Sequence, residues 1–209
     1  MIDIQKIEDL FFSKLGNGYI KFTALYTNIE GNDYYKISKE KLVTGIENIV
    51  ERDWLVKPIL TFDLDSISGT HINIEQFLGS HFDKKSNSII LHGQKKWWSH
   101  YFIYPYEENY KLRVEPPKFD LHKTTGFSSC FEEEKGMGGT FEGTNIELNK
   151  IFREIKKEPL EIEKPKIIYW NDKWSNYFDH HTEDFNSDIW TLLYPESELT
   201  LLLITEPYI

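Results

Sequence analysis

Short apolar segments that follow one another closely in the sequence constrain the fold of this chain most strongly. Residues 167–170, 188–194 and 199–205 are rich in Ile, Leu, Trp and Tyr, and an alternating segment covers 19–26. Runs of this length and composition are typical of β-strands. Further strands are predicted at 34–37, 59–65, 88–92, 97–104 and 110–115. Because several of them are joined by only a few residues, most of the pairing is expected to be antiparallel.

Three segments carry apolar residues at helical spacing and are predicted to be helices, at 4–15, 39–52 and 145–157. The second follows Ser38, a residue type that caps helix N-termini, and the third is expected to stop at Pro159. A shorter helix is expected at 75–78. Strands in neighbouring pairs with scattered helices predict an α+β fold, with a mostly antiparallel sheet and about three main helices. We expect a single domain over 1–209, with a long irregular segment at 116–143.

Composition and charge exclude several classes of protein. One cysteine in 209 residues excludes an internal disulfide framework and a Cys-based zinc cage. The apolar run Leu199–Ile204 is too short to span a bilayer, and the first residues lack the pattern of a signal peptide, so a cytoplasmic protein without a membrane partner is predicted. The net charge of −10 argues against a nucleic-acid-binding surface, which needs a basic stripe.

Two sets of residues are candidates for an active or metal site. Asp63 and Asp65 alternate along a predicted strand, so their carboxylates would share one side and could hold a cation or perform acid–base chemistry. His180 and His181 are ligand types for zinc, iron or manganese, but adjacent histidines point apart on a strand and do not share one helical face. We therefore expect no metal and no cofactor.

Other motifs carry little chemistry. Cys130 has three glutamates close behind it, which disfavour a reactive thiolate. The glycine-rich segment 136–140 lacks the lysine of a phosphate loop. The segment 95–98 combines two lysines with two tryptophans, and these two charges are too few to bind nucleic acid in so acidic a chain.

The C-terminal quarter concentrates the negative charge. From Asn171 to Glu206 there are eight acids and one base, a net charge of −7, interleaved with aromatic residues. Charge of this kind would steer association with a basic protein, and exposed rings would supply anchors. The alternative is an acidic region that keeps the protein soluble. The partner-binding residues predicted on this basis are Trp170, Asp172, Trp174, Tyr177, Asp179, Glu183, Asp184 and Asp188.

Two functions therefore remain open. The first is a non-catalytic acidic binding protein that masks a basic partner protein of bacterial or phage origin, such as a nuclease toxin or a defence protein. In general character the chain resembles the immunity proteins that bacteria keep against secreted toxins, and phage-encoded inhibitors of host defence. The second is an enzyme or small-ligand binder whose site is assembled from Asp63, Asp65, His180 and His181.

Overall fold

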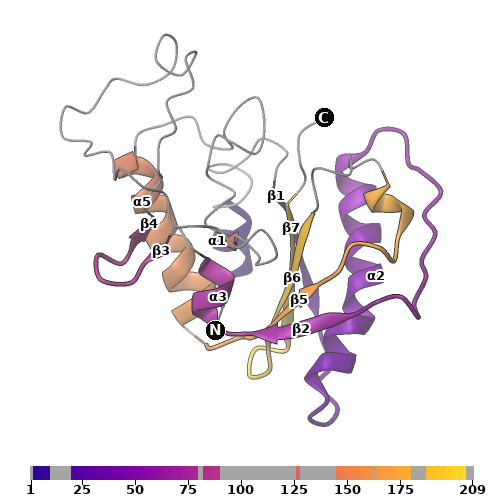
Figure 1. Cartoon of the computed structure of the whole chain (residues 1–209), viewed down its shortest axis with the longest axis horizontal. Helices are drawn as coiled ribbons and strands as arrows, with labels where there is room; N and C mark the ends of the chain where they lie inside the picture. Colours follow the sequence, from indigo (N-terminus) through magenta and orange to yellow (C-terminus); the bar gives the residue numbers. More distant parts are fainter. Residues whose placement is uncertain are drawn as a thin grey trace.

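Figure 1 shows the whole chain as a computed structural model. The structure describes residues 2–9, 20–79, 82–89, 126–127, 145–161, 163–179 and 187–205. Within these ranges a central antiparallel sheet has helices on both of its faces, so the α+β class is confirmed.

Five strands form the central sheet in the order β1-β7-β6-β5-β2, and every neighbouring pair is antiparallel. Strands β6 and β7 lie in the middle and are buried almost throughout, because helices cover both of their faces. A separate sheet pairs β3 with β4. The bounds are Ile20–Tyr26 (β1), Gly69–Ile72 (β2), Phe82–Asp83 (β3), Ser88–Ile89 (β4), Lys166–Trp170 (β5), Asp188–Tyr194 (β6) and Leu199–Thr205 (β7).

Helix α2 (Tyr34–Asp53) covers one face of the sheet (Figure 1). Its buried stripe includes Leu42, Ile46 and Ile49, which belong to the same apolar core as Trp170 and Leu202 of the sheet. The stripe has the 3.6-residue spacing that predicted this helix.

The opposite face is covered by α1 (Ile4–Asp9), α3 (Ile74–Leu78) and α5 (Asn145–Ile155). Helix α5 continues as the π-helix η4 (Lys156–Glu161). The sheet is therefore the middle of three layers, as Figure 1 shows. The core between these helices and the sheet includes Ile7, Phe77, Phe152, Ile155, Leu160, Phe22, Trp190, Leu192 and Leu201.

Most predicted helices are present with altered bounds. Ile46 is fully buried and Ile151 packs against the core, as the predicted stripes require. The predicted end of the helix at Pro159 is wrong, because the π-helix Lys156–Glu161 includes Pro159 and continues beyond it. Of the predicted helix at 4–15, residues 10–15 lie outside the described residues. No helix in the described ranges is long and apolar enough to cross a membrane.

Helix α2 begins five residues earlier than predicted. The expected strand at 34–37 is wrong, because this segment is the first turn of α2. The cap is Asp33, whose side chain accepts a hydrogen bond of 3.0 Å from the backbone N–H of Lys36. Ser38, the predicted cap, lies fully buried inside the helix, and its hydroxyl has no hydrogen-bond partner among the described residues.

Replacing Ser38 with alanine is expected to stabilise the protein by about 1 kcal/mol. The substitution removes a buried hydroxyl without a partner and puts the best helix former in its place. Urea denaturation of both proteins measures the difference. A loss of stability would show that the hydroxyl is hydrogen-bonded in solution, and Thr44→Ala, at an exposed position of the same helix, controls for helix propensity alone.

The predicted strands at 19–26, 167–170, 188–194 and 199–205 are confirmed as β1, β5, β6 and β7, each within one residue at either end. At 59–65 the predicted strand is wrong, because the described structure has only an isolated bridge between Phe62 and Ser175 and then a turn. The predicted strands at 97–104 and 110–115, the end of the one at 88–92, and the segment 116–143 apart from Gly126 and Phe127 lie outside the described residues.

Candidate protein-binding face

The aromatic residues predicted as surface anchors are buried in the core. Trp174 exposes only 1% of its surface, and Trp170 and Tyr177 are equally enclosed. The indole Nε1 of Trp174 donates a 2.6 Å hydrogen bond to the backbone oxygen of Asn171, and its ring stacks on Phe62 at 6.1 Å. The prediction that Trp174 is exposed is therefore wrong, and these rings anchor the segment to the protein itself.

Asp188 also lies inside the molecule, at 7% exposure. Its carboxylate accepts a 3.1 Å hydrogen bond from the hydroxyl of Tyr169, and its backbone N–H donates to the Thr205 hydroxyl. Burial, reinforced by the negative charge of Asp188, raises the pKa of Tyr169 above its ordinary value of 10.0. Asp188 thus holds the ends of strands β5, β6 and β7 together and is not part of an outer contact surface.

Two of the predicted acidic contact residues do reach solvent. Asp179 is exposed and Asp172 is half-buried, and both flank the short 3-10 helix η5 (Asn176–Phe178). Glu183 and Asp184, together with His180 and His181, lie outside the described residues.

The segment 171–176 is fastened to the segment 59–68 by two asparagine side chains. Asn176 accepts a hydrogen bond from the backbone N–H of Thr61 and donates one to the backbone oxygen of Ile59, at 2.8 and 2.9 Å. Asn171 makes the equivalent pair of bonds with Ser66 and Ser68. The two segments, far apart in the sequence, therefore present their outward side chains on one surface.

Asp63 and Asp65 lie in a turn of this surface rather than on a strand. The Asp63 carboxylate accepts hydrogen bonds from the hydroxyl and the backbone N–H of Ser66, and these bonds hold its pKa below the ordinary 3.8. A third bond comes from the backbone N–H of Asp65. The predicted sharing of one strand face is wrong, because Asp63 is used to close the turn. Within the described ranges no group of three His, Cys, Asp or Glu side chains is placed to hold a metal.

Exposed aliphatic side chains follow the same segment. Val56 and Ile59 expose 84% and 87% of their surfaces, and Leu55 and Leu64 are also exposed. In Figure 1 this segment leaves the end of α2 and runs down its outer side. We call the combined surface the acidic–aliphatic face. It comprises Leu55, Val56, Ile59, Asp63, Leu64, Asp65, Asp172 and Asp179.

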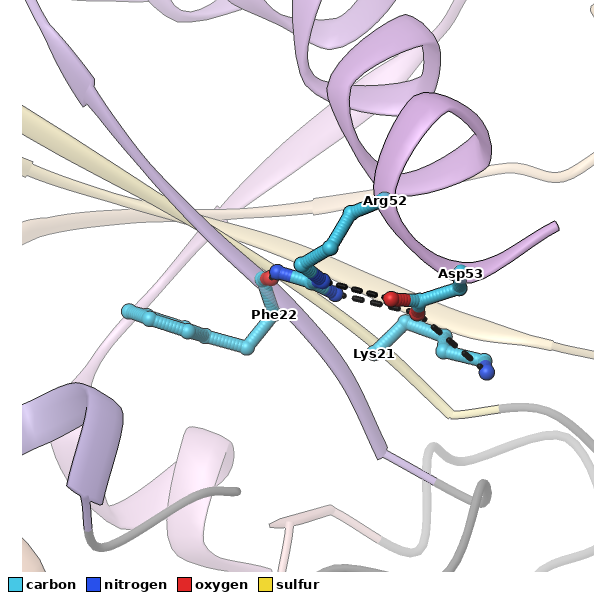
Figure 2. Close-up of polar contacts among 4 residues, drawn as sticks. All are labelled: Lys21, Phe22, Arg52 and Asp53. Carbon is cyan, nitrogen blue, oxygen red and sulfur yellow. Dashed lines mark hydrogen bonds and ion pairs between the residues drawn. The ribbon is translucent and has the colours of Figure 1, made fainter.

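An ion-pair network fixes the end of α2, where the acidic–aliphatic face begins (Figure 2). The Arg52 guanidinium donates two hydrogen bonds to the Asp53 carboxylate and a third, of 2.7 Å, to the backbone oxygen of Phe22 in β1. The Lys21 ammonium lies 3.4 Å from the same carboxylate. Burial raises the pKa of Asp53, but the hydrogen bond and charge of Arg52, helped by Lys21, outweigh burial and hold that pKa below 3.8.

Replacing Asp53 with asparagine is expected to lower the free energy of unfolding by about 1 kcal/mol at pH 7. The folded-state pKa is lowered, so the carboxylate stabilises the fold above its ordinary pKa of 3.8 and loses this effect as the pH falls through the lower folded value. The difference between the two proteins should therefore close below pH 3.8. Urea denaturation across pH measures it, with the exposed Asp65→Asn as the control; a difference that persists in acid would contradict the ion-pair explanation.

The aliphatic part of the face was not predicted. Leu55 and Val56 fall between the predicted helix and the predicted strand, and the alternation of that strand puts Ile59 on the side of Asp63. The sequence prediction nevertheless places the binding surface in the C-terminal quarter. One signal could have found them: Trp54, Leu55 and Val56 stand in a row just before Pro58, where no helical or alternating spacing can bury all of them.

Comparison of the chain with models of protein families, with curated proteins and with solved structures finds no match. The functional conclusion consequently rests on the residues of this chain.

Proposed function

We propose that this protein is a non-catalytic binding protein that docks on a positively charged protein through its acidic–aliphatic face. In its most specific form, it is an inhibitor or immunity-type protein that masks a basic toxin or defence protein of bacterial or phage origin, in the cytoplasm. The observation that carries the proposal is that exposed aliphatic and acidic side chains follow two segments that Asn171 and Asn176 join by hydrogen bonds.

The charge of this face favours a basic partner. Residues 55–66 and 171–179 contain four aspartates and two lysines, and one of the two, Lys57, is paired with Glu51. The chain as a whole carries −10, so its long-range field also attracts cations. Acidic side chains around a partner's docking site increase the rate of encounter more than the final affinity.

The aliphatic side chains supply the area that a stable contact needs. Exposed large apolar residues gathered on one segment mark interaction sites more often than scattered ones do. Burying Val56 and Ile59 against a partner would gain about 1.5–3 kcal/mol for each side chain. The face thus combines steering charge with apolar contact area, although the tryptophans predicted for this role lie inside the core.

The test is affinity capture of a partner from the source cells, followed by measurement of association rates with the purified pair. The variant Asp65→Lys/Asp179→Lys removes exposed acids of the face without breaking its hydrogen bonds. The matched variant Glu30→Lys/Glu196→Lys makes the same change of net charge at exposed positions in other loops.

We expect the first variant to associate about tenfold more slowly at low salt, and the matched variant to change the rate much less. Raising the ionic strength should remove the difference, since the Debye length falls to about 3 Å at 1 M salt. Equal effects of both variants, or a captured partner that is acidic, would refute the proposal.

A further inference from the structure

The segment Lys57–Asp63 behaves as an extended strand although it is not part of a sheet. Its side chains alternate between exposed (57, 59, 61, 63) and half-buried (58, 60, 62). This period of two is that of extended backbone. Leu60 and Phe62 pack against the core beside α2, which fixes the inward-facing side of the segment.

Within the described part of the chain, only one edge of this extended segment is hydrogen-bonded. The backbone N–H of Asp63 donates to the oxygen of Trp174 at 2.7 Å, and the oxygen of Thr61 accepts from Asn176 at 3.3 Å. Successive residues of an extended chain point their backbone groups to opposite edges. The N–H and C=O groups of Leu60 and Phe62 therefore point to the outer edge, where the described structure gives them no hydrogen bond.

An outer edge of this kind can accept another strand. By contrast, on the edge strand β1 the backbone oxygen of Phe22 already accepts a hydrogen bond from the Arg52 side chain, so it is less available to an added strand (Figure 2). The side chains on the solvent-facing face of the segment are those of Ile59, Thr61 and Asp63, and a strand added at the outer edge would lie beside them. Pro58 has no backbone N–H, so it limits the usable edge to the residues after it.

We propose that this edge binds its partner by strand addition, with Leu60 and Phe62 pairing through their backbones with an extended segment of the basic partner protein. The inference rests on the proposed function, because it specifies how the acidic–aliphatic face holds that partner. The added segment is taken to run antiparallel, so it should carry a Lys or Arg opposite Asp63 and, further along, an apolar residue opposite Ile59. These positions are four residues apart, about 13 Å along a strand.

Residue-level hydrogen exchange with a synthetic peptide tests this inference. The probe is a nine-residue peptide of alternating threonine and serine that carries lysine at its third place and leucine at its seventh. Three control peptides have glutamate in place of the lysine, serine in place of the leucine, or N-methyl groups on the amides that would pair.

At about 2 mM probe, a concentration suited to a weak complex, the amides of Leu60 and Phe62 should exchange at least threefold more slowly, and the exposed amide of Lys173 should not change. The glutamate and serine peptides should each bind about threefold more weakly. The N-methylated peptide should give no protection, since strand addition needs its backbone donors.

Absence of protection at Leu60 and Phe62, or equal binding of the N-methylated peptide, overturns strand addition. The proposed binding function is tested separately, by whether a captured basic partner depends on the exposed acids. If a captured basic partner depends on Asp65 and Asp179 but leaves the two amides unprotected, strand addition is wrong and the binding function stands. If the peptide protects them while no basic partner depends on the acids, the binding function is wrong.

Discussion

Replacing Trp174 with alanine is expected to lower the free energy of unfolding by about 3–5 kcal/mol, the range for removal of a buried tryptophan. The ring is almost fully enclosed and contacts Phe62 and Phe178, so its removal leaves a cavity in the core beside α2. For a chain of this length the melting temperature should fall by about 10 °C. Thermal and urea denaturation both measure the loss.

Two observations would distinguish this result from a role in binding. Trp174→Phe keeps an aromatic ring in the core. It removes part of the side-chain volume together with the hydrogen bond to the Asn171 oxygen, so it should lower the free energy of unfolding by only about 1–2 kcal/mol. A change of less than about 0.5 kcal/mol for the alanine variant, typical of surface positions, would show that the ring is exposed in solution.

Replacing Asn176 with alanine is expected to loosen the segment 59–63, which its backbone bonds and the packing of Phe62 still hold. The substitution removes the hydrogen bonds to Thr61 and Ile59, at about 1 kcal/mol each. A local loss of about 2 kcal/mol corresponds to about thirtyfold faster exchange of the Thr61 amide. Hydrogen exchange followed by NMR measures this residue by residue.

Asn171→Ala is the matched control, because it breaks the corresponding bonds to Ser66 and Ser68. It should speed exchange at Ser68 and leave Thr61 protected. Equal acceleration of exchange at Thr61 and Ser68 in both variants would mean that the Asn171 and Asn176 hydrogen bonds open together. Partner binding should be weakened by Asn176→Ala even though Asn176 is not part of the acidic–aliphatic face, because a loosened segment must be ordered again on binding.

Four of the five central strands could be predicted, β5, β6 and β7 because they are apolar on both sides and β1 because its apolar residues alternate. The short strand β2 (Gly69–Ile72) was missed. Segments such as Leu199–Thr205 can be buried only as central strands or core helices, and their length favours strands. The start of α2 was missed for a local reason: Tyr34 and Tyr35 are aromatic residues of high strand propensity, whereas the cap that decides the structure is Asp33. Capping depends on a single side-chain hydrogen bond, which the spacing of apolar residues does not reveal.

The binding surface was the least predictable part. A cluster of aromatic and acidic residues in the sequence does not indicate which of them face outward. Here Trp174 and Tyr177 turn inward, and the exposed apolar area comes from Leu55, Val56 and Ile59, more than a hundred positions earlier. The asparagine bonds and the backbone bonds beside them bring the two segments together, and such long-range contacts leave no local pattern.

The pairing of β1 with β7 has a consequence for how the chain is made. Ile20 lies opposite Thr205, so the first strand of the central sheet cannot pair with its neighbour until that strand, β7, has been synthesised. At translation rates of about 5–20 residues per second, this delay is about ten to forty seconds. During that time Phe22 and the apolar stripe of α2 lack the strand between β1 and β6 on which they pack. Folding of the sheet is therefore expected after synthesis of Leu199–Thr205, and a nascent chain shorter than this should be bound by chaperones.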